Sequence, residues 1–131
     1  MIIKCSQNDS ELEFSEKESL LQTAGQEYFL VTLRRNNISA FLKVYIFDPF
    51  DDHLKKFFVE IAKNWQGFDG QKVWNSLEGE LGLVCTSDHL GHFAIEITIR
   101  DIEDLWSVKN TIFVEAGQLH KIADDVKKFF D

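Results

Sequence analysis

GHFAIEITIR, residues Gly91–Arg100, is the segment from which the fold of this chain can best be inferred. Its alternate apolar residues are Phe93, Ile95, Ile97 and Ile99. Successive side chains of a β-strand point to opposite faces, so this period of two creates one wholly apolar face and one largely polar face. The pattern predicts an antiparallel strand that rests on a hydrophobic core and turns its other face toward water or a partner.

Several other segments show strand-like patterns. They are Ile2–Ser6, Glu11–Ser15, Glu27–Arg35, Ile38–Phe47, Glu80–Ser87 and Trp106–Glu115. Asn36 and Asn37 tolerate positive φ angles, so a tight hairpin is predicted between two of these strands. Short connections throughout favour antiparallel pairing.

Two segments lack this alternation and are predicted to be irregular. Glu16–Gln26 is polar and is predicted to be a loop. Gln66–Gly79 is rich in glycine, and Trp74 and Leu77 are three residues apart, which favours a single helical turn that plugs the core.

Two segments have the spacing of amphipathic helices. The apolar residues of the first are Phe50, Leu54, Phe57, Phe58, Ile61 and Trp65, and those of the second are Leu119, Ile122, Ala123, Val126 and Phe129. Asp48 and Pro49 suit the N-cap and the first turn of the first helix. Together the segments predict an α+β fold, with a single antiparallel twisted sheet of about six to seven strands and both helices packed on one face.

The chain length and the charge composition indicate one acidic domain. A length of 131 residues fits a single α+β domain over residues 1–131. The 22 acidic residues outnumber the 14 basic ones, which gives a net charge of −8. This charge repels phosphate backbones, so no nucleic-acid partner is expected. A basic protein is a more plausible partner than a lipid surface, although the same charge also serves solubility.

Cysteine usage and hydropathy predict a cytoplasmic protein. Cys5 and Cys85 are far apart and form no paired motif, which suits a reducing compartment. The first residues contain no apolar run of the length that an export signal needs. No stretch approaches the roughly twenty apolar residues of a membrane span.

The densest group of reactive side chains is Cys85, Asp88, His89 and His92. Its spacing could offer three metal ligands, but the flanking strand patterns predict a hairpin in which Cys85 points into the core. Tetrahedral zinc takes four ligands, and no second Cys/His pair completes the set. A nucleophilic thiol needs a nearby cation, which its flanks lack. We therefore expect no metal, no cofactor and no catalytic residue; Asp88 is predicted to cap a turn and His92 to lie on the polar face of the strand.

The polar face of the Gly91–Arg100 strand is the remaining candidate for a functional site. If both helices cover the apolar face, His92, Glu96, Thr98 and Arg100 point outward and form a possible protein-binding sheet face. The solvent side of any two-layer α+β domain has the same character. The alternative is a small-molecule-binding or cryptic hydrolytic domain with a pocket near Trp65, Trp74 and His89.

The second half of the chain also carries a recurrent set of residues. The set is Trp65, Gly67, WNSLEGEL at Trp74–Leu81, SDHLGH at Ser87–His92, IEITIR, Trp106, VEAGQL at Val114–Leu119, and a terminal IA…V…FF helix. It resembles a family of small bacterial domains of unknown function, over most of the chain. Size, acidity and architecture are similar to immunity proteins, which neutralise toxins by binding them. The resemblance implies a non-enzymatic protein-binding module, such as an immunity-type inhibitor.

Overall fold

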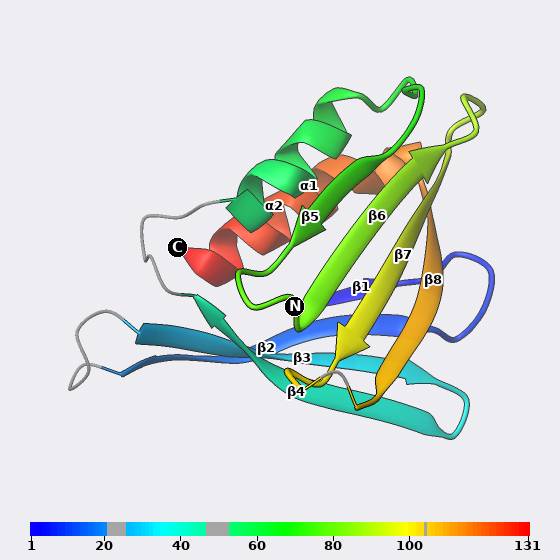
Figure 1. Cartoon of the computed structure of the whole chain (residues 1–131). Coiled ribbons are helices and arrows are strands. Elements are labelled where there is room, and N and C mark those ends of the chain that lie inside the picture. The colour runs from blue at the N-terminus through cyan, green and yellow to red at the C-terminus, as the bar shows by residue number, and fades with distance from the viewer. Residues whose placement is uncertain (21–25, 47–52, 104) are drawn as a thin grey trace.

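The computed structural model describes residues 1–20, 26–46, 53–103 and 105–131, which form an α+β arrangement of eight strands and two α-helices (Figure 1). The strands are β1 (Ile2–Lys4), β2 (Glu11–Leu20), β3 (Gln26–Arg35), β4 (Ile38–Ile46), β5 (Lys72–Asn75), β6 (Leu81–Ser87), β7 (His92–Arg100) and β8 (Ser107–Glu115). The helices are α1 (His53–Lys63) and α2 (Leu119–Phe130), and a 3₁₀ turn (Ala116–Gln118) precedes α2.

The strands form two sheets, so the prediction of one sheet with six to seven strands is wrong. The first sheet has the order β1-β2-β3-β4 and the second has the order β5-β6-β7-β8, with antiparallel neighbours throughout. The backbone N–H of Ser6 donates to the carbonyl of Phe113 at 2.8 Å, which ties the start of the chain to β8 of the second sheet. Alternation in a sequence reports which face of a strand is buried, but it does not name the strand's neighbour.

Two predicted irregular segments are partly strand. β2 continues through Glu16 to Leu20 by means of a bulge between Ser15 and Glu18, where Glu16 has a φ of 50°. The bulge absorbs residues that would otherwise break the alternation. The rest of the predicted loop, residues 21–25, lies outside the described residues, as do the predicted caps Asp48 and Pro49.

The predicted helical turn at Trp74 and Leu77 is also wrong. Trp74 belongs to β5, a four-residue strand in which it pairs with Leu83 of β6. Leu77 lies in the turn that follows and is exposed. Pairing with a neighbouring strand supplies backbone hydrogen bonds that a local spacing pattern cannot anticipate.

The predicted burial of the Gly91–Arg100 strand is confirmed. Phe93, Ile95, Ile97 and Ile99 of β7 are at most 1% exposed. α1 and α2 lie beside each other over this inner face of the second sheet, and the first sheet closes its lower end (Figure 1). One hydrophobic core includes residues of both sheets and both helices.

The described residues of the helices follow the predicted apolar spacing with one exception, and Phe50 of the predicted first stripe lies outside the described residues. Leu119, Ile122, Ala123 and Val126 of α2 are buried, as are Leu54, Phe57, Phe58 and Ile61 of α1. The spacing places Trp65 on the α1 stripe, but Trp65 lies beyond the end of the helix and is 48% exposed.

Among the described residues, no helix combines the length and the apolar character that crossing a bilayer requires.

Candidate functional site

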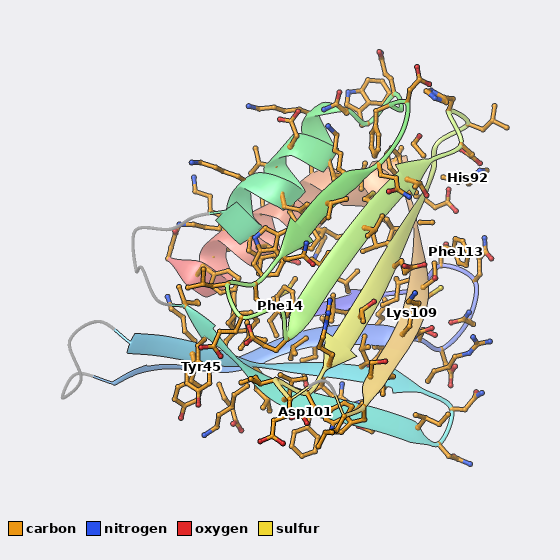
Figure 2. All side chains as sticks on the ribbon, viewed as in Figure 1. Phe14, Tyr45, His92, Asp101, Lys109 and Phe113 are labelled. Atoms are coloured by element: carbon orange, nitrogen blue, oxygen red, sulfur yellow. The ribbon has the colours of Figure 1, made fainter. Side chains whose placement is uncertain are left out.

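The second sheet has an outer face, opposite to the side that carries the helices. Strand register places alternate residues of β6, β7 and β8 on it, and we call ten of these residues the outer face: Val84, Thr86, His92, Ala94, Glu96, Thr98, Arg100, Lys109, Thr111 and Phe113. All ten are partly or fully exposed. The four residues predicted from the strand pattern therefore lie together on one open surface, with Lys109 and Phe113 of β8 beside them (Figure 2).

The outer face is mixed in character and nearly balanced in charge. Lys109 Nζ lies 3.6 Å from Glu96 Oε1 on the adjacent strand. An exposed pair of this kind stabilises the fold by less than about 1 kcal/mol, so both charges are available to a partner at little cost. Threonine, alanine, valine and phenylalanine side chains surround the charges. Such a mixture of apolar and polar area is typical of non-obligate protein interfaces.

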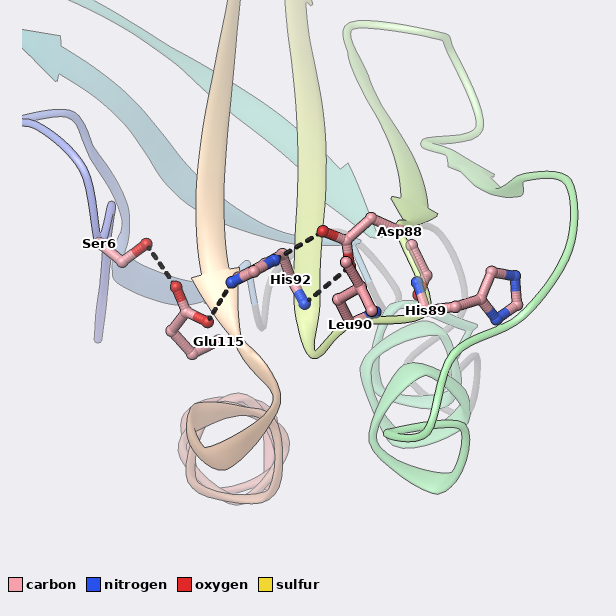
Figure 3. A network of polar contacts seen from close by, with 7 residues as sticks. Ser6, Asp88, His89, Leu90, His92 and Glu115 are labelled. Carbon is pink, nitrogen blue, oxygen red and sulfur yellow. Dashed lines mark hydrogen bonds and ion pairs between the residues drawn. The ribbon is translucent and has the colours of Figure 1, made fainter.

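The β6–β7 turn at one end of this face holds a polar network (Figure 3). Asp88 Oδ1 accepts hydrogen bonds from the backbone N–H groups of Leu90 at 2.8 Å and His92 at 3.1 Å. Its other oxygen, Oδ2, lies 2.6 Å from His92 Nδ1. On the far side of the ring, His92 Nε2 is 3.5 Å from Glu115 Oε2, and Ser6 Oγ donates to Glu115 Oε1 at 3.5 Å. The network joins the turn to β8 and to the start of the chain.

Both members of the Asp88–His92 pair have shifted pKa values. The hydrogen bond that the His92 ring donates to the Asp88 carboxylate, and then the charges of Asp88 and Glu115, raise the pKa of His92. The backbone N–H of Leu90, followed by the His92 ring, lowers the pKa of Asp88. The physical cause is that each partner favours the charged form of the other.

Of the four reactive residues that are grouped in the sequence, only Asp88 and His92 meet, and Cys85 points into the core as predicted. Cys85 is fully buried, and burial raises the pKa of its thiol to about 12. His89 turns away from His92 (Figure 3), and its Nε2 lies 2.9 Å from Asp69 Oδ1. Within the described part of the chain, no three or more Cys, His, Asp or Glu side chains gather in a way that could hold a metal ion.

Replacing Asp88 with asparagine is expected to lower the pKa of His92. The amide can still accept the backbone hydrogen bonds of the turn, but it no longer stabilises the imidazolium charge. Because the folded protein raises this pKa, the pair stabilises the fold below the ordinary histidine pKa, and the contribution is lost as the pH rises through the folded value. An NMR titration of the His92 ring measures the change. Asp124→Asn on α2 is the control, and an unchanged midpoint in Asp88→Asn would contradict the assignment.

Of the three residues predicted to border a pocket, Trp65, Trp74 and His89, one lines a groove that the structure describes. A groove of about 600 Å³ lies between α1 and β5, and Trp74 is one of its lining residues. Trp65 and His89 are not among them. The lysines that line this groove were not singled out from the sequence, because they are far apart along the chain and resemble ordinary solvated residues.

The fold and the site define a class: a two-sheet α+β domain with an open, mixed-charge sheet face. Within that class, residues 3–131 match a family of unknown function, DUF6228. The chain belongs to this family, which agrees with the resemblance to an uncharacterised domain. No curated protein and no solved structure matches the chain.

Proposed function

We propose that this domain is a non-catalytic protein-binding module and that it binds through the outer face. The observation that supports this function is the open surface of ten partly or fully exposed residues on three paired strands. The strands are held by a buried core, so the surface needs little ordering when a partner arrives. Preorganisation of this kind reduces the entropic cost of association.

The expected partner is a protein with a basic surface, and the specific form that we propose is a toxin neutralised by an immunity-type inhibitor. A net charge of −8 attracts a basic protein and speeds encounter. The outer face itself has nearly balanced charge, so contact specificity would come from its shape and polar groups. Cys5 and Cys85 are free and buried, which supports our placement of the protein in a reducing cytoplasm.

Replacing Thr98 with arginine is expected to weaken partner binding. Thr98 lies on β7 between Gly82 of β6 and Lys109 of β8, so a long cation there adds bulk and repels a basic partner. We expect the affinity to fall about tenfold or more, as for a central interface position. The measurement is quantitative capture from native extract, followed by titration of the recovered partner.

His120→Arg is the matched control, because it adds the same side chain to an exposed position on α2. The control should retain the partner. Equal capture by Thr98→Arg and the parent protein, or equal loss in both variants, would rule out the outer face as the binding surface. Circular dichroism and thermal unfolding of both variants verify that the fold is intact.

A further inference from the structure

The groove between α1 and β5 has the dimensions of a ligand site. Its volume of about 600 Å³ lies within the range of pockets that hold small molecules. The lining residues are Lys56, Phe57, Val59, Glu60, Lys63, Lys72, Val73 and Trp74. The groove lies at the β5 edge of the second sheet, whereas the outer face is built on β6, β7 and β8.

Half of the lining is apolar. Trp74 is paired with Leu83, whose side chain is buried under the helices, so the indole lies on the α1 side of the strand. Val73 is 55% exposed, and Val59 and Trp74 are partly exposed. Apolar surface that remains in contact with water gains free energy when a ligand covers it.

The other half carries positive charge in an otherwise acidic protein. Three lysines and one glutamate line the groove, which gives the lining a charge of +2, against −8 for the whole chain. Lys72 is held in place, with its Nζ 4.9 Å from the centre of the Phe68 ring and 3.5 Å from Glu60 Oε1. A cation positioned beside apolar surface is complementary to a ligand that has both an anionic group and an apolar part.

We propose that this groove binds a small amphipathic anion. An aromatic ring or short hydrocarbon chain would cover Trp74 and Val59, and a carboxylate or phosphate would meet the ammonium groups of Lys63 and Lys72. The size of the groove favours a small molecule over a protein segment. Because the groove and the outer face share no residue, the protein-binding function and this ligand site can succeed or fail separately.

An NMR titration with 4-phenylbutyrate and phenyl phosphate tests the site, and the neutral 4-phenylbutanamide is the comparison ligand. The expected result is saturable shifts of the Trp74 indole N–H and of the Val59 methyl groups. Both anions should bind about tenfold more tightly than the amide, because the amide has no charge for the lysines. A lower dissociation constant for one of the two anions shows whether the site prefers carboxylate or phosphate.

Lys63→Gln and Lys72→Gln should each weaken binding of the anions about threefold to tenfold and leave the amide unaffected. Lys121→Gln, an exposed change on α2, is the control and should bind as the parent does. Equal binding of amide and anions, shifts outside the groove, or no shifts at millimolar ligand would overturn the proposal.

Discussion

Replacing Phe14 with alanine is expected to lower the free energy of unfolding by about 3–5 kcal/mol, as the removal of a buried aromatic ring does. Phe14 lies on β2 and is completely buried. Removing its ring deletes apolar contacts and leaves a cavity that close-packed neighbours can only partly fill. The lost stability therefore has two parts: the free energy of transferring the ring from water into the core, and the cost of the cavity that remains.

The position of Phe14 explains why the cost falls at the upper end of the range for core residues. Its ring contacts Phe29 edge-to-face at 5.3 Å between centroids, and Phe58 of α1 lies at 6.5 Å. Phe129 and Phe130 of α2 lie at 6.2 and 6.1 Å. One ring thus connects the first sheet to both helices, so its removal weakens the junction between these layers (Figure 2).

Urea denaturation followed by circular dichroism measures the effect. Phe41→Ala is the matched control, because Phe41 lies on β4 of the same sheet and is 65% exposed. The control should change the free energy of unfolding by less than about 0.5–1 kcal/mol, as surface substitutions do. Similar losses in both variants would contradict the central position assigned to Phe14.

Replacing Glu80 with glutamine is expected to raise the stability at neutral pH by about 1–3 kcal/mol, because the substitution keeps a buried polar group but removes its charge, and an unpaired buried charge costs more than an unpaired neutral group. Glu80 precedes β6 and is completely buried, and within the part of the chain that the structure describes neither carboxylate oxygen meets a hydrogen-bond donor in bonding geometry. Its backbone carbonyl accepts a hydrogen bond from the Arg100 N–H at 3.0 Å, which keeps the residue in the sheet. This backbone hydrogen bond keeps the side-chain carboxyl group buried, where water cannot solvate its charge.

The pH dependence of this gain has a definite sign. Burial raises the pKa of Glu80, and this outweighs the opposite influence of the nearby Ser76 hydroxyl. A carboxyl group with a raised folded pKa costs nothing at a pH below its unfolded pKa, where it is protonated in both states. The parent protein therefore loses stability as the pH rises from the unfolded pKa through the folded pKa. The gain from Glu80→Gln should be present at pH 7 and disappear in acid.

Urea unfolding at several pH values tests this expectation. Glu103→Gln makes the same change in net charge at an exposed position in the connection between β7 and β8, and Glu103 is not among the groups that shift the pKa of Glu80. This control should show no gain that follows the titration of Glu80. A stability difference between Glu80→Gln and the parent that is independent of pH would show that the buried charge is not its cause.

Local patterns were sufficient for several parts of the fold and of the candidate site. The period of two in β7 predicted which residues are buried and which four lie on the outer face. Helical spacing predicted the buried stripe of α2. The Asn36–Asn37 pair predicted the β3–β4 hairpin, where Asn36 has a φ of 54°. These features depend on the conformational preferences of residues that are neighbours in the sequence, so they can be inferred without the tertiary structure.

Other features depend on residues that meet only in the folded chain. The division into two sheets depends on which strands pair. β5 is a strand because its backbone pairs with β6, where Trp74 lies opposite Leu83. The basic groove combines lysines from α1 with Lys72 of β5, and the burial of Glu80 is imposed by its backbone pairing with β7. Local sequence is thus enough to establish the α+β class, the apolar and polar faces and the acidic charge. The number of sheets, the groove and the buried carboxyl group follow from long-range contacts, which local periodicity does not encode.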